Sequence, residues 1–380
     1  MKTSTDRILT THVGSMPRSD RLSALLLQKE HGEAVDEAHF EAVLREEVAR
    51  IVALQAEAGV DIVSDGELSK IGYATYIKDR LSGFGGHRPR KAALDLQPYP
   101  EYMEKMALVA GKQSFKRMCC TGPITVTTTK PLDFDLGNFR AALTGAKVAE
   151  GFLNAASPGV VSAFQPNDYY PSQVAYLEAI SQAMQSEYEA IVNAGFVLQV
   201  DCPDLAMARH TGFQDLSEAE FLSQAEQQVE ALNAALVNIP ADKLRMHVCW
   251  GNYEGPHTAD IDLVKILHLI FKAKPAAILF EASNPRHGHE WAVWQAAKIP
   301  DDKILVPGVV DSTSNYVEHP ELVSQRIMQF ANIVGRERVI AGTDCGFSTF
   351  AGVGKVDAKI VWKKLESLAE GARRASAKLF

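Results

Sequence analysis

The sequence lacks the features that mark secreted and membrane-spanning proteins. It has only five cysteines among 380 residues, and an odd count in a chain this long does not form a disulfide framework. No apolar stretch approaches the roughly 20 residues that a transmembrane helix needs, and residues 1–7 contain no apolar signal core. These absences predict a cytoplasmic protein with reduced thiols that are available to bind a metal ion.

The sequence also lacks a basic run or an Arg-rich arm. Its formal net charge is −8 at pH 7, which disfavours nucleic acid as an obligate partner. A hydrophobic content of 46% and a charged content of 23% are typical of a globular protein with a full-sized core. No linker divides the chain, so we predict one domain over residues 1–380. We expect it to act on small molecules, without membrane partners and with homo-oligomerisation left open.

Helical periodicity alternates with short apolar runs along the chain. Helices are predicted near residues 36–58, 173–194 and 357–374, and others begin at Ser217 and Pro320. Eight candidate strands lie near residues 8–15, 62–67, 118–125, 197–203, 244–250, 276–282, 304–311 and 339–346. This alternation predicts one α/β domain, a closed parallel (β/α)8 TIM barrel.

Two long connections are predicted after strands 2 and 3, at residues 72–111 and 127–171. Long connections in compact domains often form lids or binding loops. A subunit contact or a barrel plug is the alternative interpretation.

Polar residues end most of the predicted strands, and a parallel barrel gathers these ends on the face where active sites are built. His247 and Cys249 can point the same way, because alternate residues of a strand share a face. Cys345 and Glu281 end two other runs. Two sulfurs, one imidazole and one carboxylate make a plausible tetrahedral zinc set. The alternatives are a core His beside a buried Cys, and Glu290 or water in place of Glu281.

Seven short segments carry a resemblance to a known family. They are residues 10–17, 64–67, 121–124, 199–201, 247–249, 307–311 and 344–346. In their order and their strand-end placement they resemble the C-terminal catalytic half of cobalamin-independent methionine synthase, over nearly the whole chain. The resemblance implies a barrel with a zinc ion that binds a thiol substrate as thiolate. The implied zinc ligands are His247, Cys249, Glu281 and Cys345.

The resemblance also implies roles for other strand-end residues. Those that would hold the amino and carboxyl ends of homocysteine are Gly14, Ser15, Glu67 and Asp201. Asp311 and Asp344 would be catalytic residues. For Glu67 and Asp201, salt bridges at the barrel mouth are the alternative to substrate contact.

The sequence departs from the family pattern at two places. The family has a Trp shortly after the Thr-Gly-Pro segment, but residues 125–130 contain none. It also has a His two residues after the Asp of the seventh strand, where this chain has Thr313. A pteridine gains from aromatic stacking, and Thr cannot deliver a proton near pH 7 as imidazole can. Both changes therefore disfavour a folate methyl donor.

The resemblance thus predicts a zinc-dependent transferase that moves an alkyl group, foremost methyl, to a zinc-bound thiol such as homocysteine. The donor is left open between a folate, which the two departures disfavour, a methyl group on a corrinoid or other donor protein, a small methyl donor and an epoxide. Residues 73–80, 251–257 and 315–319 resemble a stand-alone branch that includes epoxyalkane–coenzyme M transferases, and epoxide opening is the alternative activity.

Two further interpretations are a zinc-free enzyme like uroporphyrinogen decarboxylase and a zinc store or structural site. The His, Glu and two Cys at convergent positions disfavour the decarboxylase. Structural zinc sites usually take ligands that are close in sequence, so ligands spread over about 100 residues favour catalysis.

Overall fold

The protein folds as a closed parallel barrel. The computed structural model describes residues 1–89, 91–110 and 117–380. Eight strands form one sheet in the order β1-β10-β9-β8-β7-β6-β5-β2, and a parallel bridge between Thr11 and Ile62 joins its two ends. The strands are β1 (Leu9–Thr10), β2 (Ile62–Val63), β5 (Glu150–Ala156), β6 (Val197–Asp201), β7 (Leu244–His247), β8 (Ala277–Glu281), β9 (Ile304–Val310) and β10 (Ile340–Thr343). The predicted TIM barrel is confirmed.

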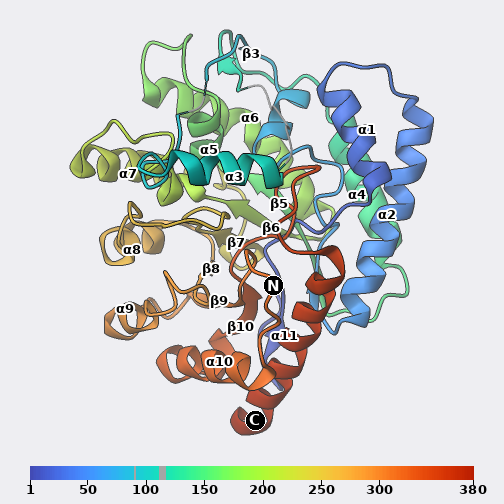
Figure 1. The fold of residues 1–380 in the computed structure, drawn as a ribbon, viewed down its shortest axis with the longest axis vertical. Coiled ribbons are helices and arrows are strands. Elements are labelled where there is room, and N and C mark those ends of the chain that lie inside the picture. Colours follow the sequence, from blue (N-terminus) through green and yellow to red (C-terminus); the bar gives the residue numbers. More distant parts are fainter. Residues whose placement is uncertain (90, 111–116) are drawn as a thin grey trace.

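Helices surround the strands (Figure 1). They are α1 (Asp20–Glu30), α2 (Glu37–Glu57), α3 (Pro100–Ala110), α4 (Lys130–Leu143), α5 (Pro158–Phe164), α6 (Gln173–Asn193), α7 (Glu218–Ala235), α8 (Leu263–Lys272), α9 (Trp291–Ala296), α10 (Pro320–Val334) and α11 (Ala358–Leu379). Short 3₁₀ turns are η1 (Thr75–Asp79), η2 (Pro203–Leu205), η3 (Met207–Arg209), η4 (Ala241–Lys243) and η5 (Arg336–Arg338). The five predicted helices correspond to α2, α6, α7, α10 and α11. Ser217 and Glu220 form the expected capping box at the start of α7.

The third barrel strand differs from the prediction. Residues 118–125 contain only the short strand β4 (Cys119–Cys120), which pairs antiparallel with β3 (Phe84–Gly85) outside the barrel. The third strand is instead β5, inside the segment predicted as the second long connection. A single connection, residues 64–149, therefore joins β2 to β5 and carries α3 and α4.

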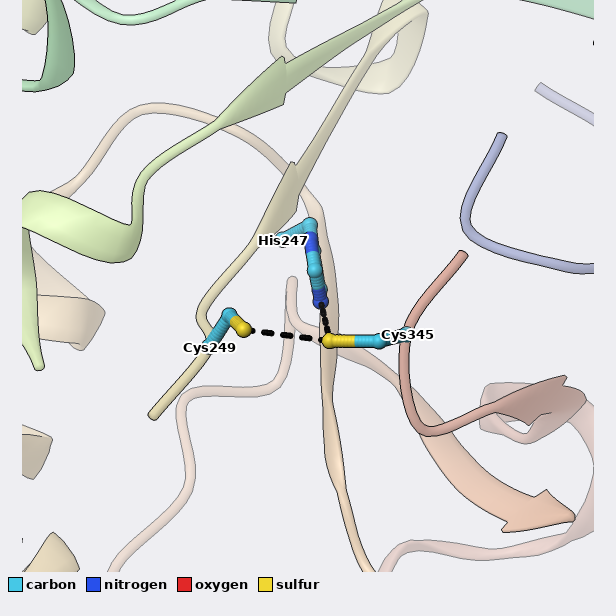
Figure 2. A group of neighbouring side chains, drawn as sticks. All are labelled: His247, Cys249 and Cys345. Atoms are coloured by element: carbon cyan, nitrogen blue, oxygen red, sulfur yellow. Dashed lines mark hydrogen bonds between the residues drawn. The ribbon is translucent and has the colours of Figure 1, made fainter. Parts of the chain in front are cut away.

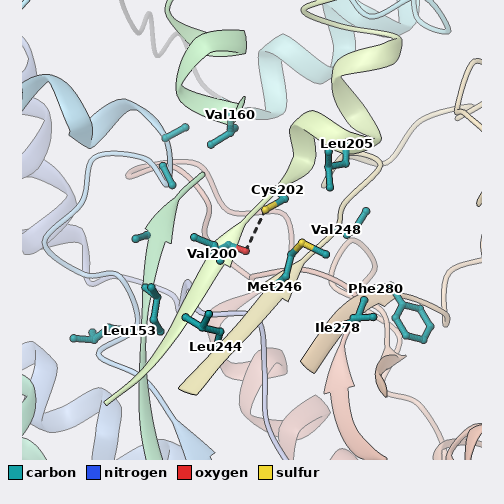
Figure 3. Packing of buried hydrophobic residues seen from close by; sticks show 14 of the residues in the cluster. Leu153, Val160, Val200, Cys202, Leu205, Leu244, Met246, Val248, Ile278 and Phe280 are labelled. Carbon is teal, nitrogen blue, oxygen red and sulfur yellow. Dashed lines mark hydrogen bonds between the residues drawn. The ribbon is translucent and has the colours of Figure 1, made fainter. Parts of the chain in front are cut away.

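Alternate residues of each strand face opposite sides of the barrel wall. Leu153, Val200 and Met246 belong to the large apolar core between the strands and the helices (Figure 3). Phe152 and Leu279, from the opposite parity, pack together in a smaller cluster inside the barrel. The same parity directs the polar residues at the strand ends toward the barrel axis.

Two further features concern the cysteines and the helices. All five cysteines are free and buried. In the described part of the chain, no helix combines the length and the apolar character that crossing a membrane requires.

A hydrogen-bonded column of polar side chains fills part of the barrel interior. Arg245 is 1% exposed and donates to Gln199 Oε1 at 2.8 Å, to Thr11 Oγ1 at 3.0 Å and to the His12 carbonyl at 2.6 Å. The Gln199 amide donates in turn to Asp201 Oδ1 at 2.8 Å. The column thus links the interior of β1, β6 and β7 to the strand end where Asp201 lies.

We expect Arg245→Met to lower the free energy of unfolding by about 3 kcal/mol, because the substitution leaves buried acceptors without a donor. Urea denaturation followed by circular dichroism measures the change. Arg373→Met is the matched control, because the Arg373 side chain is 70% exposed. Equal stability of the two variants would contradict a stabilising role for the column.

Candidate metal centre

Three potential metal ligands meet at the C-terminal end of the barrel. His247 ends β7, Cys249 follows two residues later, and Cys345 lies just after β10. Figure 2 shows their side chains pointing toward one another. The sulfurs of Cys249 and Cys345 are 3.0 Å apart, and Cys345 Sγ lies 3.7 Å from His247 Nε2. All three residues are buried, and their ligand atoms lie within 4.8 Å of one another.

This donor set fits a zinc ion. Ligand atoms in a tetrahedral site with bonds of 2.0–2.3 Å lie roughly 3.3–3.8 Å apart, so the observed spacings need only small side-chain adjustments. The Gly251 N–H points at Cys249 Sγ from 3.2 Å, where it can stabilise a thiolate. Thiolate and imidazole are the ligands that zinc favours.

Glu281, the fourth expected ligand, lies beside this group. It ends β8, and its Oε1 accepts a hydrogen bond from the Trp250 N–H at 2.8 Å. Its Oε2 accepts from the Asn284 amide at 2.7 Å. The hydrogen bond from Cys345 lowers the pKa of the Cys249 thiol, but burial and the neighbouring Glu281 carboxylate outweigh it and raise that pKa overall. The Glu281 carboxylate therefore lies next to the candidate ligands, but both of its oxygens accept hydrogen bonds from protein donors.

Asp201 connects the polar column to the candidate ligands. Its Oδ1 lies 3.5 Å from His247 Nδ1, and its carboxylate accepts hydrogen bonds from the amides of Gln199 and Asn154. A carboxylate on the far ring nitrogen is the usual way in which proteins orient a metal-binding His. It leaves His247 Nε2 directed at Cys345.

A cavity of about 660 Å³ opens onto the three candidate ligands. Ser15, Glu67 and Asp201 also line it. Gly14 lies directly behind Glu67: a β-carbon at Gly14 would come within 2.5 Å of Glu67 Oε1. Gly14 therefore allows the Glu67 carboxylate to pack closely against the backbone. The structure brings the expected substrate-binding residues together with the candidate ligands.

Glu67 has an unusual backbone and an unusual carboxyl group. Its φ is 56°, which is uncommon for a residue other than glycine. The Asp65 carboxylate and the Arg18 guanidinium hold this conformation by bonding to the Glu67 N–H and carbonyl. Burial raises the pKa of Glu67 to about 8, the nearby Lys70 charge opposes that shift, and the Asp201 charge adds to it. Arg18, in contact with the backbone of Glu67, was not singled out from the sequence.

Asp344 holds the loop that follows Glu281. Its carboxylate accepts hydrogen bonds from the N–H groups of Ala282, Ser283 and Asn284 and from the Ser283 hydroxyl. Burial raises the pKa of Asp344 to about 7, and the Glu281 charge adds to the shift. In this arrangement Asp344 positions the segment that carries Glu281.

The Asp311 carboxylate accepts hydrogen bonds from the residues of the turn that follows it. It accepts hydrogen bonds from the Thr313 N–H and hydroxyl at 2.9 and 2.8 Å and from the Ser314 N–H at 3.0 Å. Burial raises the pKa of Asp311, but these hydrogen bonds and the Lys364 charge outweigh it and lower the pKa overall. Among the described residues that line the cavity, neither Asp311 nor Asp344 occurs.

Lys355 is a charged residue near the centre that the sequence did not indicate. Its ammonium donates to the Asn252 carbonyl at 2.9 Å. Burial lowers the pKa of Lys355 to about 8, and the Glu254, Cys345, Asp311 and Cys249 groups oppose the shift. A single lysine in a loop carries no sequence signal, because an exposed charge is the usual finding.

The long connection after β2 forms part of the cavity wall. Arg88, Pro89, Lys91 and Leu96 line the cavity from this connection. Aromatic residues also line it, namely Tyr73, Phe164, Tyr253 and Phe350. In the described part of the chain, residues 125–130, where the family Trp is missing, contribute nothing to the wall. The first of the two expected long connections thus contributes residues to the cavity wall.

Comparison with known proteins decides the family. The sequence profile of the family described as "Cobalamin-independent synthase, Catalytic domain" matches residues 8–360. The chain belongs to this family. A methionine synthase of Saccharolobus islandicus (strain L.S.2.15 / Lassen #1) is 26% identical over 369 residues, which cover 96% of this chain and 93% of the relative. One of Sulfolobus acidocaldarius is 23% identical, covering 95% and 90%.

Solved structures of cobalamin-independent synthases have the same fold. A B12-independent methionine synthase from Shewanella sp. W3-18-1, in complex with selenomethionine, matches with a TM-score of 0.73 at 17% identity. The match covers 98% of this chain and 99% of that one. A Listeria monocytogenes protein that is described as a vitamin-B12-independent methionine synthase matches with a TM-score of 0.65 at 19% identity, and the match covers 98% of this chain and 99% of that one.

We expect Cys345→Ser to bind one equivalent of zinc less than the unaltered protein when both are dialysed against the same low zinc concentration. Loss of an outer-shell partner costs about 10- to 100-fold in affinity, and loss of a sulfur ligand should cost more. Elemental analysis provides the readout. Cys119→Ser, at a buried cysteine in β4, is the control and should keep its zinc. Equal zinc content in the two variants would remove Cys345 from the ligand set.

Proposed function

We propose that this protein is a zinc-dependent methyltransferase that transfers a methyl group to the thiol of homocysteine. The observation that carries the proposal is the convergence of His247, Cys249 and Cys345 at a cavity that also contains a buried acidic pair. Membership of the cobalamin-independent synthase family and relatives named methionine synthase support it.

We infer that His247, Cys249, Cys345 and Glu281 hold the zinc ion. A bound zinc ion would lower the pKa of a substrate thiol and keep it as the nucleophilic thiolate. Glu281 is the ligand best suited to yield its place, because a carboxylate is the hardest donor of the four. The Trp250 N–H and the Asn284 amide already provide hydrogen bonds for a Glu281 that is not a ligand.

Glu67 and Asp201 support an amino thiol as the acceptor. Two buried carboxylates at the cavity wall would stabilise an ammonium group between them. Ser15 lines the same cavity and offers a hydroxyl to the carboxyl end. The alternative substrate, coenzyme M, carries a sulfonate, which the acidic pair would repel. The acidic pair therefore favours homocysteine over the epoxyalkane–coenzyme M reaction.

For the methyl donor, we propose a corrinoid-bound methyl group or a small methyl donor rather than a folate; an epoxide belongs to the alternative activity. Thr313 replaces the family His, and its hydroxyl donates to Asp311 instead of delivering a proton to a donor. The missing Trp has less weight than Thr313, because Phe164, Tyr253 and Phe350 supply aromatic faces elsewhere in the wall. The cavity volume lies within the range of small-molecule sites, with room beyond the thiol.

We expect Glu67→Gln to raise the dissociation constant for homocysteine about 10-fold while zinc stays bound, because a charge-assisted hydrogen bond is lost. The difference should grow as the pH rises through about 8, since Glu67 must be deprotonated to attract an ammonium. Isothermal titration between pH 6.5 and 9 measures it. Asp215→Asn, which changes an exposed acid of the same cavity wall, should bind normally. Unchanged binding in Glu67→Gln would place the amino end elsewhere.

We expect the zinc-loaded protein to form methionine from homocysteine faster with methylcobalamin than with polyglutamylated methyltetrahydrofolate. Mass spectrometry of the product measures both rates, with chelator-treated protein as the control. Efficient turnover with the folate alone would show that Thr313 in place of the family His does not prevent a folate from serving as the methyl donor. Methionine formation that persists in the metal-free protein would refute the zinc-dependent reaction.

A further inference from the structure

A second cluster of metal-binding side chains lies at the same end of the barrel. His257 and Asp260 belong to the loop after β7, and His287 belongs to the loop after β8. Asp260 Oδ2 lies 3.1 Å from both His257 Nδ1 and His287 Nε2. The three ligand atoms lie within 4.8 Å of one another. The side chains of Asp260 and His287 are only 4% and 3% exposed.

The outer ring nitrogens of both histidines have their own protein partners. His257 Nε2 lies 3.0 Å from the Tyr253 carbonyl, and His287 Nδ1 lies 3.1 Å from Glu290 Oε2. Metal-binding histidines characteristically donate their second N–H to a backbone carbonyl or a carboxylate. When both rings donate outward in this way, their remaining lone pairs face Asp260.

His210 gives an independent sign that this cluster is incomplete. It is 0% exposed, and its Nδ1 lies 3.3 Å from Asp260 Oδ1. Neither ring nitrogen of His210 has a hydrogen-bond partner within the described ranges of the chain. Burying an imidazole without a partner is costly, so its position beside Asp260 points to a group that the protein side chains do not supply.

We propose that His257, Asp260 and His287 bind a second divalent transition-metal ion, foremost zinc, beside the buried ring of His210. Imidazole and carboxylate are established ligands of such ions. The observed spacing of 3.1 Å is close to the about 3.3 Å between nitrogen or oxygen ligands of a tetrahedral site.

The competing explanation of this cluster is two imidazolium rings that share Asp260. Two added protons would carry the same charge as one divalent ion, so charge balance does not separate the two explanations. Two protons would, however, leave His210 with no hydrogen bond to a described residue and only its 3.3 Å contact to Asp260 Oδ1. A metal ion would replace the protons at His257 Nδ1 and His287 Nε2 and would place a cation next to the ring nitrogens of His210.

The second site would join the loops that form the active-site cavity. Asp95, from the long connection after β2, accepts hydrogen bonds from the Tyr253 hydroxyl at 2.5 Å and the His257 N–H at 2.9 Å. His287 Nε2 lies 3.9 Å from Glu281 Oε2, so the two sites adjoin. A metal ion here would fix the cavity wall next to the thiol-binding centre without itself binding the thiol.

Zinc binding to the full-length protein tests the proposal by elemental analysis after dialysis. We expect two zinc ions per chain in the unaltered protein and in His268→Ala, an exposed-histidine control. Cys249→Ser/Cys345→Ser should keep one ion, and His257→Ala/His287→Ala should lose one. Cobalt substitution gives a second readout. The Cys249→Ser/Cys345→Ser protein should lose the sulfur-to-cobalt charge-transfer absorption and keep the visible bands of a cobalt ion with nitrogen and oxygen ligands.

The outcomes separate the two sites. One zinc ion in the unaltered protein and none in Cys249→Ser/Cys345→Ser would overturn the second site and leave the first intact. One ion that survives the cysteine changes and disappears with the histidine changes would support the second site and count against the first. If His257→Ala/His287→Ala does not fold, the cobalt spectrum of the Cys249→Ser/Cys345→Ser protein still tests the second site. Absence of the bands of a cobalt ion with nitrogen and oxygen ligands would overturn it.

Discussion

The alternation of side chains along the parallel strands is the constraint on which this protein's chemistry depends. The parity that places Phe152 and Leu279 inside the barrel also turns Asp201, His247 and Glu281 inward at the strand ends. A register shift of one residue would send these groups into the apolar layer beneath the helices. Apolar packing on the outer face of the barrel therefore fixes the register that assembles the site.

The interior column turns this placement into a defined geometry. Arg245, Gln199 and Asp201 are linked by hydrogen bonds, and Asp201 approaches the ring of His247. Buried polar groups that are fully satisfied are rigid, because any displacement leaves a donor or an acceptor unpaired. Asp201 belongs both to this column and to the cavity wall, so it can orient a metal ligand and face the substrate at once.

The sequence was sufficient for the parts of the fold that depend on local patterns. The alternation of helices and strands predicted the barrel. The polar strand ends and the His-x-Cys spacing predicted the meeting of His247 with Cys345, because strand parity and parallel closure follow general rules. The predicted position of the third barrel strand was wrong. Residues 118–125 contain a real strand, but local pattern does not specify its antiparallel partner, and β5 contains Gly151 and Asn154, which are poor strand formers. The position of Lys355 and the cluster of His257, Asp260 and His287 depend on loop conformations that periodicity does not encode.

The central claim is that the substrate thiol enters the ligand shell of the metal ion at this barrel mouth. Zinc-edge X-ray absorption of the Cys249- and Cys345-containing centre tests it most directly, with a His257→Ala/His287→Ala background removing any signal from the neighbouring cluster. On adding homocysteine, we predict that the number of sulfur ligands rises by one and that one oxygen ligand, assigned to Glu281, is lost. A sulfur count that stays at two with saturating homocysteine would contradict the account.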